Sequence, residues 1–211
     1  MEPLTLTTAR LVLRPFAPAD ADEVHAAVQD PGIQRWTAVP SPYTREHAAS
    51  FVGRIAPDGW RDDTAYAFAV RLAPGTRTGT GTDTGGGAGA LAGAADLHRR
   101  GEGPWEVGYW TAPEHRGRGY TTEAVRALAH WAFTGLGSVR LEWRAEVGNT
   151  ASRAVAERAG FTVEGVERAN LPAGGTLRDC WSGSLLCSDL GLPLPLPYLP
   201  ADAAGNVGGG S

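Results

Sequence analysis

The chain has 211 residues, of which 42% are hydrophobic and 20% charged, and its formal net charge is −4. This length and composition predict one ordinary soluble globular domain. The acidic balance removes the general attraction to phosphate backbones on which nonspecific nucleic-acid binding depends. No stretch approaches the roughly 18 apolar residues of a membrane span, and the first residues lack the pattern of a signal peptide, so the cytoplasm is the expected compartment.

The predicted elements begin with a half-buried strand over 10–15, where polar and apolar residues alternate. A helix opens at Pro18 with acidic residues in its first turn, which the helix dipole favours. A second helix is expected from Thr44, which can cap it, to Ile55. The segment between the two helices, which holds Trp36, is expected to be irregular.

Strands over 64–72 and 90–97 come next, joined by a segment over 74–89 that consists largely of Gly, Thr, Ala and Asp. Such a segment buries too little apolar surface to offset its ordering entropy, so a mobile hairpin loop is predicted. The remaining predicted elements are strand 105–111, helix 121–133, strand 139–147, a short helix from Asn149 to Gly160, and an antiparallel strand pair over 161–168 and 178–186.

Two cysteines, Cys180 and Cys187, lie seven residues apart in one predicted strand region and would point to opposite faces. A disulfide between them is therefore not expected, and two cysteines do not make a metal framework. The five histidines show neither metal-ligand spacing nor a paired acid. No metal site is predicted.

One loop combines features that hold phosphate. Strand 105–111 is followed by a turn of arginine and glycine and then by a helix that opens with two threonines. The unpaired amides of a first helical turn and the helix dipole favour an anion, glycines let it approach closely, and Arg116 and Arg118 add charge. By composition alone, a solvated loop is an equal alternative.

The residues of this loop, Pro113-Glu114-His115-Arg116-Gly117-Arg118-Gly119-Tyr120-Thr121-Thr122-Glu123-Ala124, resemble the acetyl-CoA loop of the GNAT superfamily. The motif of that family is Arg/Gln-x-x-Gly-x-Gly/Ala. Arg116 and Gly119 fit it, whereas Thr121 stands at the last position. Together with the opening over 10–16 and the pattern from Asn149 to Phe161, the likeness spans roughly residues 8 to 187. It is to the branch that acetylates the N-termini of ribosomal proteins, the RimJ/RimL type.

The resemblance implies an α/β fold with a mixed, mostly antiparallel sheet of six or seven strands and about four helices over 1–187. A Pro/Gly-rich tail over 188–211 is expected to be disordered. The implied co-substrate is acetyl-CoA, without a metal. The implied cofactor-binding residues are Tyr109, Trp110, Thr111, Arg116, Gly117, Arg118, Gly119, Tyr120, Thr121, Thr122, Asn149 and Ser152. In this family the fourth strand splays from the fifth, so Tyr109 to Thr111 would bind through backbone atoms, while Asn149 has helix capping as an alternative role.

The resemblance also implies two catalytic residues. Glu106 occupies the family's acidic position and would take the amine proton, with Trp105, Val107 and Trp110 expected to bury it. The alternative is a solvent-facing or ion-paired glutamate. Because Ala156 stands where many relatives carry a tyrosine, Ser152 is the implied proton donor to the leaving thiolate, with solvent or a helix-start role as alternatives.

The implied reaction is direct transfer of the acetyl group from acetyl-CoA to a primary amine, in the first place a protein or peptide N-terminal α-amine. A small-molecule amine, such as an amino acid or antibiotic, and a catalytically silent acyl-CoA-binding module are the alternatives. The resemblance places Trp36, Tyr43 and Trp60 near the acceptor, although such aromatics more often pack in a core. The sequence leaves the oligomeric state open, a homodimer included.

Overall fold

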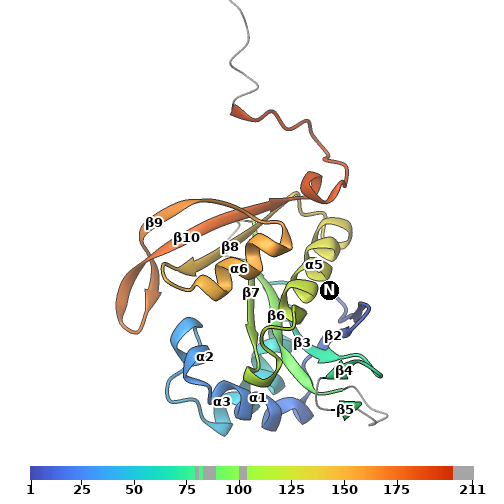
Figure 1. Ribbon diagram of the computed structural model, residues 1–211, viewed down its shortest axis with the longest axis vertical. Coiled ribbons are helices and arrows are strands. Elements are labelled where there is room, and N and C mark those ends of the chain that lie inside the picture. Colours follow the sequence, from blue (N-terminus) through green and yellow to red (C-terminus); the bar gives the residue numbers. More distant parts are fainter. Residues whose placement is uncertain (79–80, 83–88, 100–103, 202–211) are drawn as a thin grey trace, which may run out of the picture.

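The computed structural model describes residues 1–78, 81–82, 89–99 and 104–201 (Figure 1). Within them, an eight-stranded sheet has the order β1-β2-β3-β6-β7-β8-β10-β9. Its strands are β1 (Leu6–Thr7), β2 (Leu11–Pro15), β3 (Ala65–Leu72), β6 (Leu91–Arg99), β7 (Trp105–Thr111), β8 (Arg140–Glu146), β9 (Thr162–Ala173) and β10 (Thr176–Leu186). All neighbours are antiparallel except β7 and β8. The mixed, mostly antiparallel sheet is confirmed; the predicted strand number was too low, because β1 is a two-residue edge strand without a periodic signal.

The helical segments are η1 (Pro18–Asp20), α1 (Ala21–Val28), α2 (Pro31–Trp36), α3 (Arg45–Ser50), the π-helical turn η2 (Phe51–Ile55), α4 (Ala56–Arg61), η3 (Pro113–His115), α5 (Tyr120–Gly135), α6 (Thr150–Ala159) and η4 (Cys187–Leu190). Thr44 caps α3 as predicted, accepting a hydrogen bond from the His47 amide. The helical run then continues to Arg61, past the predicted end.

Helix α2 corrects the irregular segment predicted between the first two helices. Asp30 caps it by accepting a hydrogen bond from the Ile33 amide at 2.8 Å, and Pro31 occupies its first turn. Both residue types are favoured at these positions. The helix is short, so its hydrophobic periodicity is too brief to detect in the sequence.

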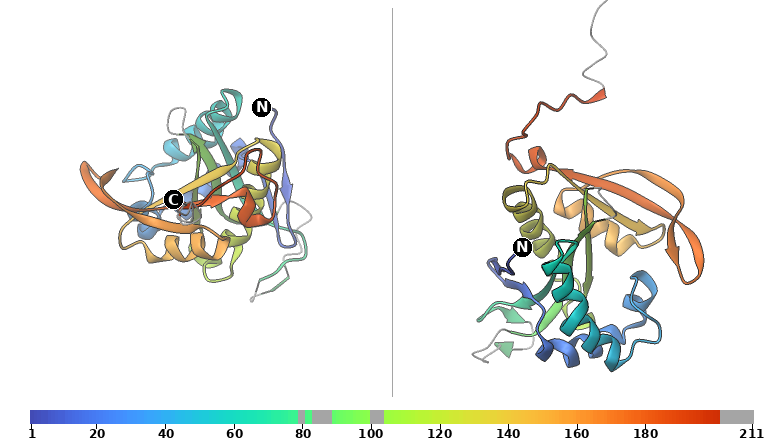
Figure 2. Two further views of the ribbon diagram at one scale, coloured as in Figure 1. Left: turned by 90° about the horizontal axis from the view of Figure 1, so that it is seen from above. Right: turned by 180° about the vertical axis from the view of Figure 1, so that it is seen from behind.

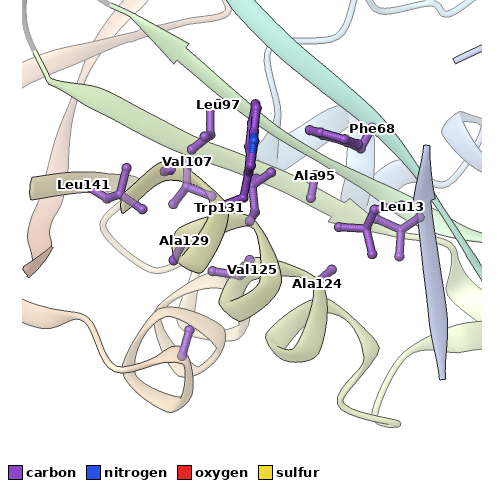
Figure 3. Packing of buried hydrophobic residues seen from close by; sticks show 14 of the residues in the cluster. Leu13, Phe68, Ala95, Leu97, Val107, Ala124, Val125, Ala129, Trp131 and Leu141 are labelled. Atoms are coloured by element: carbon purple, nitrogen blue, oxygen red, sulfur yellow. The ribbon is translucent and has the colours of Figure 1, made fainter. Parts of the chain in front are cut away.

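The sheet separates two apolar clusters. On one face, α5 and α6 pack against residues such as Phe68, Leu97 and Val107 (Figure 3). On the other face, α1, α2 and α3 pack against Ala67 and Ala69. Because successive strand residues point to opposite faces, the alternation along β3 divides its side chains between the two clusters.

The strands β7 and β8 part soon after they meet. Within the described residues they pair at just two positions, Trp105 with Leu141 and Glu106 with Glu142. Beyond these positions the strands diverge, and α6 lies beside β8 (Figure 1). The facing main-chain groups of 107–111 and 143–147 therefore have no ladder partner across the gap. Buried main-chain groups require partners, so this gap is suited to a ligand that can supply them.

Two segments differ from the sequence-based expectation. The predicted loop 74–89 contains a short pair of strands, β4 (Arg77–Thr78) and β5 (Gly81–Thr82), while 79–80 and 83–88 lie outside the described residues.

After the β9–β10 hairpin, which projects from the body (Figure 2), residues expected to be disordered pack on the core, namely Leu190, Leu192 and Leu194. Residues 202–211 of the predicted tail lie outside the described range. Cys180 and Cys187 are both buried and are not joined by a disulfide.

Candidate active site

The arginine–glycine loop turns sharply before α5. Gly117 and Gly119 have φ angles of +73° and +77°, in the left-handed region that favours glycine, and Gly119 is the N-cap of α5. Both are exposed. The first-turn amides of α5, from Tyr120 to Thr122, have no partner within their own helix. The loop thus presents main-chain donors at the positive end of a 16-residue helix.

A network of hydrogen bonds made by Thr8, Arg10 and Glu123, here called the buttress, supports this loop from behind. Arg10 donates through Nε to Glu123 Oε2 at 2.6 Å and through Nη1 to the Arg118 carbonyl oxygen at 3.0 Å. Glu123 Oε1 accepts from the Thr8 hydroxyl at 2.6 Å and the Arg10 amide at 3.1 Å. Burial opposes the charge of Glu123, but these hydrogen bonds outweigh it and lower the pKa of this carboxyl. The buttress holds a loop carbonyl inward, so that it does not face an incoming anion.

Arg116 was predicted to bind the cofactor, but its side chain is directed toward Asp30. Its guanidinium donates to Asp30, with Nη2 at 2.6 Å from Oδ1, and its main-chain N–H donates to the Pro113 carbonyl oxygen at 3.3 Å. The Arg116 hydrogen bond is the main cause that lowers the pKa of Asp30. Arg116 therefore links the loop to the N-cap of α2. Arg118, the second arginine of the loop, is partly exposed.

The other loop positions face the sheet. Tyr120 is buried, with the Arg10 guanidinium 4.8 Å from its ring centroid. The hydroxyls of Thr121 and Thr111 are hydrogen-bonded to each other, so Thr121 is turned toward β7. Thr122 is partly buried in the same helical turn. Trp110 packs against the cluster on the opposite face of the sheet.

Across the gap, the first turn of α6 carries two of the predicted residues. Asn149 caps this helix by accepting a hydrogen bond from the Ser152 amide at 3.1 Å. The Ser152 hydroxyl accepts a hydrogen bond from Trp143 Nε1 at 3.0 Å and lies 3.2 Å from the Tyr109 hydroxyl. The side chain of Tyr109, of which only backbone contacts were expected, thus reaches from β7 to α6.

Glu106 lies where the gap begins, at the last paired position of β7 and β8. Only 8% of its side chain is exposed. The predicted surroundings were wrong in part, because Trp105 and Val107 point to the opposite face and pack beside α5. The neighbours of Glu106 are charged instead: His98 Nε2 lies 3.7 Å from Oε1, and Arg144 Nη1 lies 3.8 Å from Oε2. Two cations therefore favour the carboxylate form.

His98 is a residue that the sequence reasoning missed, since no paired acid was expected for it. Its Nδ1 lies 2.8 Å from Asp96 Oδ2 on the same strand. The hydrogen bonds with Asp96 and then Glu106 raise the pKa of His98 to about 10. The spacing of Asp96 and His98, two apart on a strand and therefore on one face, was a signal for this pair. Within the described ranges, no group of three or more His, Cys, Asp or Glu residues could hold a metal ion.

The three aromatics considered for the acceptor side differ in exposure. Tyr43 and Trp60 are buried core residues. Trp36 is 39% exposed at the end of α2, and its ring lies close to Gly148, just past β8. Nearby, Arg35 makes a bidentate hydrogen bond to Glu146. The end of α2 therefore borders the gap on the face that carries Glu106.

A separate hollow of about 510 Å³ lies between α1, the start of β6 and η3. The charged residues that line it are Glu23, Asp30 and Glu114. Its acidic lining makes it unsuitable for phosphate. No helix in the described part of the chain is long and apolar enough to cross a membrane.

Comparisons with known proteins bear on this site. A family model described as an acetyltransferase (GNAT) domain matches residues 10–162. Among curated proteins, p20 of Bacillus licheniformis, an uncharacterised N-acetyltransferase, is 29% identical over 182 residues, covering 86% of this chain and 96% of p20. YdaF of Bacillus subtilis (strain 168), a candidate ribosomal N-acetyltransferase, is 46% identical over 81 residues, covering 38% of this chain and 44% of YdaF.

Among solved structures, RimJ of Mycobacterium smegmatis, in complex with a coenzyme A disulfide, has a TM-score of 0.72 at 23% identity and covers 90% of this chain and 92% of RimJ. At this identity the likeness shows the fold. The family match includes the loop before α5, the gap between β7 and β8, and the start of α6. The chain therefore belongs to the GNAT acetyltransferase family and is an acetyl-CoA-dependent N-acetyltransferase.

Proposed function

We propose that the acceptor is the α-amino group of a protein or peptide. In this proposal the pyrophosphate of acetyl-CoA lies on the main-chain donors of residues 117–122 beside Arg118, with Arg116 bracing the loop. The pantetheine enters the gap along the backbone of Tyr109 to Thr111, near Asn149. The name of YdaF supports this acceptor class, because its 81-residue match is the one with the highest identity among the relatives given above. A ribosomal-protein acceptor would also make the cytoplasm the compartment.

The observation that carries the proposal is the setting of Glu106. A carboxylate at the vertex of the gap can accept a proton from an amine that attacks the thioester, directly or through water. The nearby cations His98 and Arg144 favour the charged form of this carboxylate, whereas its burial favours the protonated form. An α-amine, with an ordinary pKa of about 7.7–8.0, needs less help to lose its proton than a lysine side chain, with an ordinary pKa of about 10.4. The site therefore suits N-terminal amines.

A calorimetric titration with acetyl-CoA tests the cofactor site. Gly119→Glu is expected to abolish binding, because it places a carboxylate and a strained backbone where the phosphates would lie. Gly137→Glu is the matched control, because Gly137 is also exposed with a left-handed φ of +66° but lies beyond the far end of α5. Equal loss of binding in both variants would show that strain, and not the loop, is responsible.

A free-thiol assay then tests the acceptor. Peptides with a free N-terminus are expected to release coenzyme A, whereas the same peptides with a blocked N-terminus and a lysine are not. Glu106→Gln should lower kcat by about 10²-fold or more, the usual effect of a general base. Turnover with small amines alone would favour the small-molecule alternative and would exclude an N-terminal acceptor.

A further inference from the structure

The gap between β7 and β8 contains a tyrosine hydroxyl that the proposed reaction has not used. Tyr109 points to the same face of β7 as Trp105 and Val107, toward α6, and is partly buried. Its phenol spans the gap and donates a hydrogen bond to the Ser152 carbonyl oxygen at 2.9 Å. Glu106 lies on the other face, so Tyr109 and Ser152 border the gap on the side away from the proposed base.

The direction of each hydrogen bond around Ser152 follows from the chemistry of the groups. An indole N–H can only donate, so the Ser152 hydroxyl oxygen accepts from Trp143. A carbonyl oxygen can only accept, so the single hydroxyl hydrogen of Tyr109 is used on the Ser152 carbonyl. At the 3.2 Å contact between the two hydroxyls, Ser152 is therefore the donor and Tyr109 the acceptor.

In this arrangement the Ser152 hydroxyl donates its hydrogen bond to the phenol oxygen of Tyr109, which is a weak acceptor. The hydrogen of a serine hydroxyl rotates to suit its surroundings unless partners fix it. Here Trp143 and Tyr109 fix the hydroxyl from both sides. Burial raises the pKa of Tyr109, so its phenol stays neutral. An anionic sulfur is a stronger acceptor than a neutral phenol oxygen, so it can take over the hydrogen bond.

We propose that Tyr109 is a positioning residue that holds the Ser152 hydroxyl ready to donate a hydrogen bond to the leaving thiolate of coenzyme A. This inference rests on the proposed function. In the transfer, the nitrogen–carbon bond forms as the carbon–sulfur bond breaks, and the sulfur leaves with the electron pair. Ser152 stabilises that charge, and the proton that finally converts thiolate to thiol is the one given up by the amine.

The pKa of the thiol group of bound coenzyme A tests this role of Tyr109 and needs no acceptor amine. The ultraviolet absorbance of the thiolate is followed against pH in the full-length protein, with the desulfo-coenzyme A complex subtracted to remove the signal of protein groups. Ser152→Ala and Tyr109→Phe are each expected to raise the thiol pKa by about one unit, a tenfold change in ionisation. Because Tyr109 acts through Ser152, the double variant should match Ser152→Ala alone.

Tyr66→Phe is the matched control, since it also removes a phenol that donates one hydrogen bond, here to Asp63, which lies on neither strand of the gap. It should leave the thiol pKa unchanged. With an N-terminal peptide, Tyr109→Phe should lower kcat and leave the KM for acetyl-CoA unchanged. If coenzyme A binds Tyr109→Phe and its thiol titrates as in the wild type, the inference is wrong although the proposed function stands. If coenzyme A does not bind the wild type, both fail.

Discussion

Arg10 and Glu123 are 113 residues apart in the chain, yet the guanidinium of one is hydrogen-bonded to the carboxylate of the other directly behind the arginine–glycine loop. The same arginine also holds the Arg118 carbonyl oxygen. The first residues of the domain thereby set the shape of a loop in the middle of the chain. In the proposed acetyl-CoA site, this tie would give the sheet edge at β1 and β2 a part in shaping the loop that holds the phosphates.

Glu123→Gln should destabilise the fold by about 1.5–3 kcal/mol, the usual contribution of hydrogen bonds to a charged group, and should weaken acetyl-CoA binding. Chemical denaturation and calorimetry measure the two effects. Because the folded-state pKa of Glu123 is lowered, its stabilising contribution is present above its unfolded pKa and is lost as the pH falls through the folded pKa. The difference from the variant should therefore shrink at acid pH. Asp58→Asn, which removes an exposed partner of Arg61, is the control and should change stability by less than about 1 kcal/mol.

Asp20 and Asp22, two positions apart at the start of α1, should differ sharply in their effect on stability. Asp20 is 2% exposed and accepts hydrogen bonds from Arg14, Arg71 and the Ala17 amide. Asp20→Ala removes the buried carboxylate that Arg14 and Arg71 share, with Arg71 retaining its ion pair with Glu23, and should cost about 3–5 kcal/mol. Asp22 pairs with Arg45 on the surface, so Asp22→Ala should lower the free energy of unfolding by less than about 1 kcal/mol. Similar unfolding midpoints for the two variants would contradict this assignment.

Asp30→Asn separates two roles of one side chain. Asparagine caps helices as well as aspartate does, so α2 should remain intact. The ion pair with Arg116 is lost, so the loop loses its tie to α2 and the affinity for acetyl-CoA should fall by about 2- to 5-fold, as expected for a partly exposed pair. Calorimetric titration measures the Kd for acetyl-CoA. An unchanged Kd would mean that the pair between Arg116 and Asp30 does not brace the loop.

His98 should remain protonated well above neutral pH. Its folded pKa of about 10 exceeds the ordinary value of 6.5, so its stabilising contribution is complete below the unfolded pKa and is lost as the pH rises through 10. An NMR titration of the imidazole should show no deprotonation between pH 6 and pH 8. In Asp96→Asn the titration should move toward the ordinary range, because the Asp96 hydrogen bond is the largest cause of the shift. An ordinary pKa in the wild type would mean that Glu106 is not flanked by a cation at this position.

The local parts of this structure could be predicted from sequence, because they depend on residues close together in the chain. Strand β7 has its predicted bounds, and the caps at Thr44 and Asn149 lie where short polar residues precede helical patterns. The gap between β7 and β8 was anticipated only through the family resemblance. In α2, the Asp30-Pro31 start is a helix signal, but the helix is six residues long, which is too short for a helical period to show.

The surroundings of Glu106 could not be predicted in the same way. His98 faces Glu106 because β6 and β7 pair in a register that places these two residues opposite each other. Such a register is set by the turn and by the packing of both strands on the core, which one sequence does not disclose. Arg144 comes from β8, which is adjacent only through a parallel connection over α5. The sequence therefore identifies Glu106 as the candidate base but does not predict the charged residues around it.

The brief pairing of β7 and β8 also has a mechanical consequence. The backbone ladder that would lock the two halves of the sheet together is two residue pairs long, so the halves are held chiefly by apolar side chains of the shared core. Apolar contacts are non-directional and tolerate small rotations better than a hydrogen-bonded ladder does. A change in the width of the gap between β7 and β8 would break no ladder hydrogen bonds beyond Glu106, although the hydrogen bond from Tyr109 to Ser152 spans it. A ligand with hydrogen-bond donors and acceptors along both sides would supply the missing hydrogen bonds between β7 and β8. It would then hold the two halves of the sheet as one rigid body.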